Sequence, residues 1–415
     1  MSSPTESAEP SALAFSYPRF RLFWLTTLAA SFAAQIMSVA VAWEVWAITG
    51  EAIYLGLVGL AQFLPALSLV LVTGLAADRF PRRRIIQVAM VFEFACAVAL
   101  VLFTVLQGHD VWPIFVVLVV LGTARAFVGP AGSSLAPNLV PPSALANAVA
   151  MNATAWQLAT ILGPVVAGLL LTFSATVAFS VAGLLAIFAF IAISFIRSPA
   201  QKTSHQDSSV STLLAGFRYI WHEKVVLGAI SLDLFAVLMG GAVALMPIFA
   251  TDILTVGPWG LGMLRSAPGV GAIVTALWLA RFPIRTNAGI ILFTFVAAFG
   301  FFTLLFALSV SVWLSVPLLA LMGACDMVSV SIRETIMQLW TPDHVRGRVN
   351  AVNSVFIGAS NELGEFRAGV MAAFVGAQAA VVFGGAATMG VAALWAWIFP
   401  GLRTQDSLDR KMVEG

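Results

Sequence analysis

Five ionisable side chains fall near the middle of long apolar stretches of this sequence: Arg125, Asp326, Glu362, Glu365 and Arg367. At the centre of a lipid bilayer an ionisable side chain costs on the order of 2.5–3.5 kcal/mol, so each needs a physical reason to be there. If all five ionise, two positive charges oppose three negative ones. The spare carboxylate suits a bound proton or a cationic substrate. We expect a site for proton coupling or substrate binding; pairing that only holds helices together is the alternative.

Further charges accompany this group. Asp233 is expected to belong to the same site, although it lies nearer one end of its apolar stretch. Arg333 follows Asp326 by seven residues and so shares its helix face; with Glu334 it forms either the inner end of a polar path or a cap on the helix end. Glu44 and Glu93 are expected near the lipid interface, with their carboxylates reaching toward water.

The composition indicates what positions these charges. Apolar residues make up 60% of the chain, charged residues only 10%, and the mean hydropathy is +0.98, which excludes an ordinary soluble protein of 415 residues. The apolar residues form runs long enough to cross a hydrocarbon core of roughly 30 Å, and these predict an all-α integral membrane fold of twelve transmembrane helices. The runs cover 22–48, 54–77, 85–107, 112–135, 149–172, 174–196, 225–250, 259–280, 287–309, 312–337, 349–375 and 378–399.

Lysine and arginine fall almost entirely on one side of these predicted helices. The opposite loops carry only Glu51, Asp110 and Asp252 as charges. Positively charged loops face the cytoplasm, so we expect a multi-pass protein of the inner (plasma) membrane with both termini cytoplasmic. The net charge of +2 is then a signal of topology, and no nucleic-acid partner is expected.

No residue pattern indicates enzymatic chemistry. The four histidines lie in loops or near helix ends, without a catalytic triad or a phosphate-binding loop. Cys96 and Cys325 each lie within a predicted helix and are expected to be small buried residues. We therefore expect no enzyme, no metal site and no cofactor.

The polar stretches divide the chain into five parts. We expect a cytoplasmic N-terminus (1–18), a six-helix bundle (19–197), a cytoplasmic linker (198–223), a second six-helix bundle (224–400) and a cytoplasmic C-terminus (401–415). Within the linker, apolar residues at Leu213, Leu214, Phe217, Ile220 and Trp221 follow helical spacing. They predict a short amphipathic helix, either on the membrane surface or packed against the bundle.

The second bundle repeats the first at an offset of 201 residues. Leu121–Arg125 aligns with Met322–Asp326, and Gly163–Gly168 aligns with Gly364–Gly369. Arg125 and Asp326 therefore occupy equivalent positions, and we expect them to face or border a central cavity between two pseudo-symmetric bundles. Parallel six-helix repeats of this kind are typical of secondary transporters with a midplane site.

Several motifs of the sequence resemble those of a known family. The loop that contains Gly74, Asp78, Arg79 and Arg82 is similar to the G-x-x-x-D-R-x-x-R-R signature of the major facilitator superfamily. The resemblance implies a cytoplasmic latch between the two halves. The second copy has Ala280 in place of the aspartate, so any latch there is weaker.

Two helices add to the resemblance. Leu121-x-x-x-Arg125-x-x-x-Gly129 is similar to the motif whose arginine the family links to proton transfer. Gly163, Pro164 and Gly168 are similar to the element that the family associates with antiporters, although Ala159 and Ala167 replace two of its glycines. The stretch 264–271 resembles the branch of macrolide and enterobactin exporters.

The resemblance implies a monomeric transporter in the lipid bilayer that exports small amphipathic compounds (drugs, siderophores or metabolites) in exchange for protons, by alternating access. Multidrug resistance belongs to the same expectation. An importer, or a flippase for lipids or lysolipids, on the same fold remains the alternative.

Overall fold

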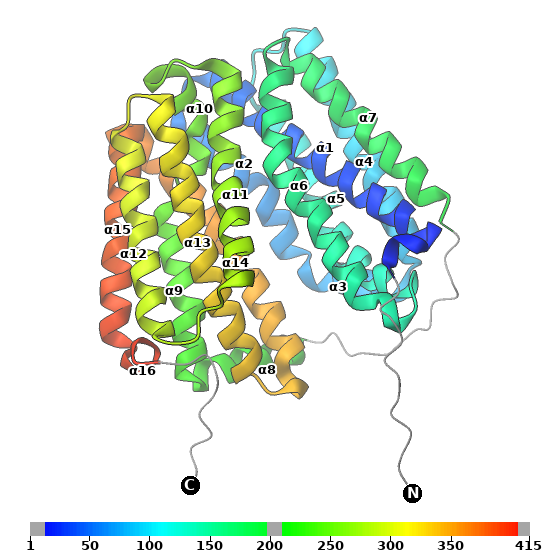
Figure 1. Cartoon of the computed structure of the whole chain (residues 1–415). Helices are drawn as coiled ribbons and strands as arrows, with labels where there is room; N and C mark the ends of the chain where they lie inside the picture. The colour runs from blue at the N-terminus through cyan, green and yellow to red at the C-terminus, as the bar shows by residue number, and fades with distance from the viewer. Residues whose placement is uncertain (1–12, 197–209, 406–415) are drawn as a thin grey trace, which may run out of the picture.

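The structure is a computed structural model that describes residues 13–196 and 210–405. Residues 1–12 of the expected N-terminus (1–18), residues 406–415 of the expected C-terminus (401–415), residue 197 and the first part of the expected linker, 198–209, lie outside the described residues. Both described ends of the chain lie at the same end of the molecule, here called the terminus side; the opposite end is called the far side (Figure 1).

The N-terminal half contains seven helices, α1 to α7, joined by short connections. Their bounds are α1 Pro18–Thr49, α2 Ala52–Ser68, α3 Val70–Arg79, α4 Arg82–Val105, α5 Trp112–Leu135, α6 Leu145–Leu171 and α7 Ala175–Ser194. The C-terminal half follows α8 Val210–His222 and contains α9 Lys224–Gly240, α10 Met246–Ile248, α11 Gly257–Arg281, α12 Ala288–Leu308, α13 Val312–Trp340, α14 Asp343–Val375, α15 Ala377–Ile398 and α16 Pro400–Arg403.

Twelve membrane crossings account for these helices, which confirms the predicted fold class. Ten described segments are long and apolar enough to span a bilayer, and the bent pair α2 and α3 gives an eleventh. The twelfth is α14, whose 33 residues are ample for a crossing but include Glu362, Glu365 and Arg367 within their apolar part. The sequence thus carries its densest intramembrane charge on one helix.

Two crossings are interrupted, and each interruption has a local cause. Between α2 and α3 the axis bends by 57° around Leu69, one turn after the helix-interrupting residue Pro65. The α9 helix ends at Gly240, and the chain continues through short 3₁₀, α and π turns to Ile253. A Cβ on Gly241 would meet the Gly364 carbonyl of α14, so only glycine fits this contact.

The two halves meet at a far-side seam formed by the pairs α2·α14 and α6·α11. A Cβ on Gly168 of α6 would lie only 2.7 Å from the Pro258 carbonyl and 2.9 Å from the Gly262 Cα. A Cβ on Gly369 of α14 would lie 2.7 Å from the Gly56 Cα of α2. Glycine therefore permits backbone-to-backbone contact in both pairs. From this seam the halves spread toward the terminus side (Figure 1).

The short helix α8 packs against the C-terminal half. The Tyr219 hydroxyl donates to the Trp340 carbonyl at 2.6 Å, and the Phe217 ring lies edge-on to Phe356 of α14. Ile220 is buried, whereas Trp221 remains exposed beside Phe217. Of the two predicted roles, packing against the bundle is therefore the one that these contacts describe.

Candidate functional site

A cavity of about 330 Å³ lies between the halves, next to the seam. Five helices and one 3₁₀ turn form its wall: α1, α2 and α5 come from the first half, and α11, α14 and the turn Val243–Leu245 come from the second. Its charged lining residues are Arg125, Arg265, Glu362 and Glu365, and its neutral polar residues are Gln35, Ser38 and Gln62. We call this space the central cavity.

Glu362 and Glu365 come from neighbouring turns of α14 and converge on the N-terminal half. A Cβ on Gly59 of α2 would collide with the Glu362 carboxylate and lie 3.5 Å from Oε2 of Glu365. Glycine at this position lets two acidic groups approach the backbone of the opposite half. Two carboxylates so close together repel each other when both are ionised.

Arg265 of α11 is the cationic partner of this pair. Its guanidinium lies within electrostatic reach of both Glu362 and Glu365, and its Nη1 donates to the Ser38 hydroxyl of α1 at 3.3 Å. Its Nε is buried with no hydrogen-bond partner. Arg265 therefore joins the carboxylates to the N-terminal half while retaining an unused donor.

The sequence prediction missed Arg265, which the same criterion could have found. It is the one charge within the apolar stretch 257–280, and a charge in such a helix indicates a functional position.

Arg125 borders the central cavity but does not face Asp326. Its Nη2 forms an ion pair with Glu93 of α4 at 2.8 Å, and its Nη1 donates to the Gln62 side chain at 3.2 Å. The Glu93 side chain is only 2% exposed. The expectation that Glu93 lies at the lipid interface was therefore wrong, because α4 packs on α5 with this carboxylate turned inward to its counter-charge.

Arg367 is directed away from the cavity that the sequence predicted for it. Its guanidinium donates to the Leu238 and Met239 carbonyls at the end of α9, with an Nε-to-oxygen distance of 2.9 Å for Leu238. The last carbonyls of a helix lack partners within the helix and carry partial negative charge. Arg367 thus caps the interrupted helix α9, and none of the described cavities has it in its lining.

A second charged cluster lies within the C-terminal half. Arg333 of α13 forms an ion pair with Asp233 of α9 and lies 4.0 Å from the Asp326 carboxylate. The Arg333 and Asp233 side chains are about a tenth exposed, whereas that of Asp326 is 47% exposed. Asp326 lines two smaller cavities, of about 190 and 120 Å³, rather than the central one.

The residues of the expected latch lie at the terminus side of the N-terminal half. The Arg82 Nη1 donates to the Ser134 carbonyl near the end of α5 at 2.7 Å, and Arg83 donates to the Ser194 carbonyl of α7. These contacts cap helix ends within one half. Arg79 is exposed, Asp78 is half-buried, and a Cβ on Gly74 would have open space around it.

The predicted antiporter-like element lies at the seam. A Cβ on Gly163 would lie 2.5 Å from the Gln35 Cβ of α1, and Gly168 touches α11 as described above. The Pro164 carbonyl would lie 2.6 Å from a Cβ on Gly262. The three residues thus allow α6 to approach helices of both halves, which gives their small size a structural reason.

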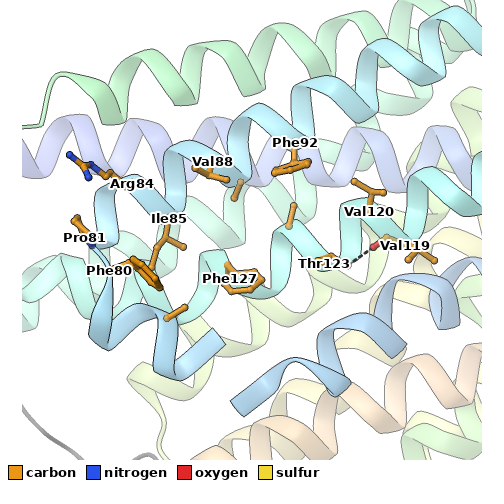
Figure 2. A pocket seen from close by; sticks show the side chains of 13 residues that line it. Phe80, Pro81, Arg84, Ile85, Val88, Phe92, Val119, Val120, Thr123 and Phe127 are labelled. Atoms are coloured by element: carbon orange, nitrogen blue, oxygen red, sulfur yellow. Dashed lines mark hydrogen bonds between the residues drawn. The ribbon is translucent and has the colours of Figure 1, made fainter. Parts of the chain in front are cut away.

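A larger cavity, of about 620 Å³, is remote from these charges. It is a groove between α3, α4 and α5, lined by apolar side chains with Arg84 at one end (Figure 2). Val88 and Phe92 are about half exposed along it. The groove has no carboxylate in its lining, unlike the central cavity.

These observations define the class of protein. Two repeated six-helix halves that cross the membrane around a charged cavity form a transporter of the major facilitator type, and not an enzyme. The chain belongs to the family of transmembrane secretion effectors, whose profile matches residues 10–414.

Two exporters are among the known proteins of similar sequence. The chain is 28% identical over 378 residues to the multidrug efflux pump Tap of Mycobacterium tuberculosis, covering 87% of this chain and 88% of that protein. It is 26% identical over 351 residues to the enterobactin exporter EntS of Escherichia coli, covering 81% of each. The nucleoside transporter NupG has the same fold, with a TM-score of 0.71, 12% identity and coverage of 92% of this chain and 100% of that chain.

Proposed function

We propose that this chain exports small amphipathic compounds in exchange for protons, by alternating access, from the cytoplasmic side of the cell's inner membrane. The similarity to Tap and EntS supports export and a drug-like or siderophore-like substrate class. The positive loops support a cytoplasmic position for both termini. With that orientation, the closed far-side seam corresponds to an inward-facing state.

The observation that carries the proposal is the cluster of Arg265, Glu362 and Glu365 in the central cavity. Together with the Arg125–Glu93 pair, two guanidinium groups stand against three carboxyl groups, so one negative charge is in excess when all are ionised. A proton or a cationic group of a substrate compensates that charge. Because both occupy the same carboxylates, binding of one displaces the other, which is the condition for exchange.

The position of the cluster links this exchange to movement of the halves. The carboxylates lie against Gly59, and Arg265 reaches Ser38, so the occupancy of the cluster changes forces at the contact between the halves. A ligand shifts a conformational equilibrium only through different interactions with the two states. Breaking and remaking these contacts would supply that difference. A single copy of the chain contains all of them, so we propose a monomer as the working unit.

The test uses purified protein in proteoliposomes with an imposed pH gradient and three fluorescent probes: ethidium, rhodamine 6G and Hoechst 33342. We expect the unchanged protein to accumulate a cationic probe against its gradient when protons flow the opposite way. Glu365→Gln should only equilibrate the probe, because it leaves two guanidinium groups against two carboxylates and so removes the excess negative charge that a proton or a cation would compensate. Asp252→Asn, which removes an exposed far-side carboxylate, is the matched control and should accumulate normally.

Two results would overturn the proposal. Accumulation by the Glu362→Gln, Glu365→Gln double variant at the unchanged rate would remove the cluster from coupling. Probe movement by the unchanged protein in the same direction as the protons, or a pH-independent transfer of fluorescent lysolipid between leaflets, would favour an importer or a flippase instead.

A further inference from the structure

Three cavities follow one another along the inner wall of the C-terminal half. The central cavity and the 190 Å³ cavity share Val243 and Glu365 in their linings. The 190 Å³ cavity and the 120 Å³ cavity share Val237, Asp326 and Asn361. The last of the three extends along α9, α13 and α14 toward the terminus side, where Asn353 and Glu334 line it. A connected series of hollows therefore leads from the central carboxylates toward that side.

Ionisable groups recur along this series. Glu365 stands at the junction of the first two cavities, and Asp326 at the junction of the last two. Arg333 pairs with Asp233 and approaches Asp326 to 4.0 Å. At the end of the series the Asn353 amide donates to the Glu334 carboxylate at 3.4 Å. The two smaller cavities combine apolar surface with these polar groups, and each is larger than the roughly 30 Å³ that one water occupies, so bridging water molecules fit beside the polar groups.

The charges of this cluster do not balance, unlike those of the N-terminal half. One guanidinium, that of Arg333, serves the two carboxylates of Asp326 and Asp233. Asp326 also has the larger exposed fraction and faces both cavities. The ionisable groups around it are Arg333 and Cys325 on α13, Asp233 on α9 and Glu365 on α14. A proton arriving on Asp326 removes the excess negative charge and leaves the Arg333–Asp233 pair intact.

We propose that Glu365, Asp326 and Asp233 form a proton relay through the C-terminal half, which connects the central cavity to the cytoplasmic side; this rests on the proposed proton exchange. In the first step the O–H bond of the Glu365 carboxyl breaks and an O–H bond forms on the Asp326 carboxylate, through intervening water. Glu365 becomes ionised as Asp326 becomes neutral, so total charge is unchanged. Asp326 then passes the proton to water in the 120 Å³ cavity, where Asp233 and Glu334 accept and release it.

The relay gives the proton a path that is separate from the path of the substrate. A bulky substrate enters between the halves, while the proton leaves behind the wall formed by α13 and α14. A substrate that occupies the central cavity then does not block release of the proton it displaces.

The experiment compares two transport modes in the same proteoliposomes, with ethidium as the probe. Accumulation driven by a pH gradient requires proton movement, whereas exchange of ethidium for ethidium at equal pH does not. We expect Asp326→Asn to lose gradient-driven accumulation and to keep exchange near the unchanged rate. Asp326→Glu should recover accumulation, because it restores a carboxyl group; a role in packing alone would not be rescued in this way.

The variants are chosen so that misfolding can be separated from a loss of proton transfer. Asp326→Asn leaves the Arg333–Asp233 ion pair in place, and the double variant Asp233→Asn, Arg333→Gln removes both members of that pair, so that neither is left without the other. Both should elute as monodisperse protein, and the double variant should also lose accumulation while retaining exchange. Unchanged accumulation in either variant would overturn the relay but leave the central exchange intact. Absence of pH-driven accumulation in the unchanged protein would overturn the proposed function itself.

Discussion

The two halves of the molecule share a scaffold but differ in their charges. In the N-terminal half, Arg125 and Glu93 form a closed pair of one cation and one anion, and the other polar lining residues are neutral. In the C-terminal half, Arg265 and Arg333 stand against a larger number of carboxylates. The charges of the first arrangement balance, whereas the second has an excess of carboxylates, which the proposed exchange of a proton for a cation requires.

The difference in charge is clearest at positions that the internal repeat makes equivalent in the two halves. Glu365 replaces Pro164 of the first copy, and Asp326 replaces Arg125. Gly168 and Gly369 are also equivalent, and both remain glycine at the far-side seam. Divergence therefore altered chemistry while it preserved close backbone contact. Packing depends on shape, which both copies must keep, but an exchange site needs an unbalanced charge in only one of them.

The largest effect is expected at the shared seam. Gly369→Leu and Gly168→Leu should each abolish transport, because even a Cβ at these positions would lie 2.7 Å from the opposite backbone. Both variants should also favour separation of the far-side ends, measured by labelling of a cysteine placed there in a background without Cys96 and Cys325. Gly390→Leu is the control, because a Cβ there meets nothing within 4 Å. Normal transport in either seam variant would contradict the need for close contact.

A smaller effect, on stability, is expected when the ion pair between Arg125 and Glu93 in the N-terminal half is broken. Glu93→Gln should lower the free energy of unfolding by about 1–2 kcal/mol, since Arg125 then loses its counter-charge within the helix bundle. The double variant Glu93→Gln, Arg125→Gln should recover part of that loss. Thermal unfolding in detergent measures both. By contrast, Glu365→Gln should change stability little, and a larger loss there than in Glu93→Gln would reverse the proposed division between the halves.

The smallest effect is expected at the terminus side, where the halves are apart. Asp78→Asn should increase labelling of a cysteine in the inner part of α11 by about 1.4-fold to fivefold, because an ion pair near the protein surface contributes about 0.2–1 kcal/mol. The physical reason is a weaker latch in the state that closes this side. Asp343→Asn, at an exposed pair within one helix, serves as the control. Equal labelling in all three proteins would remove Asp78 from the latch.

Much of the fold followed from the sequence alone. Twelve apolar stretches predicted twelve crossings, since only helices satisfy every backbone hydrogen bond within a single segment in lipid. The offset of 201 residues predicted two copies of one unit. The charges of α14 were also visible, because three ionisable residues in one apolar stretch are costly enough to require a reason.

Which charges meet was decided by the tertiary structure. The spacing along the sequence placed Arg125 and Asp326 at equivalent positions but contained no information on Glu93, 32 residues earlier, or on the carbonyls that Arg367 caps. Those partners depend on the rotation of each helix and on the interruption of α9 at Gly240. Helix rotation is set by packing against neighbours, so a pattern within one segment does not determine it.

The presence of charges near the midplane and the partners of those charges are therefore determined at different levels. The sequence by itself determined that this protein carries costly charges inside a membrane, and in which half they gathered. Only the tertiary structure decided that Arg265, Glu362 and Glu365 share one cavity against Gly59, while Arg367 does not reach it. The cost of burying a charge acts on each residue separately, but its function depends on neighbours that come from distant helices.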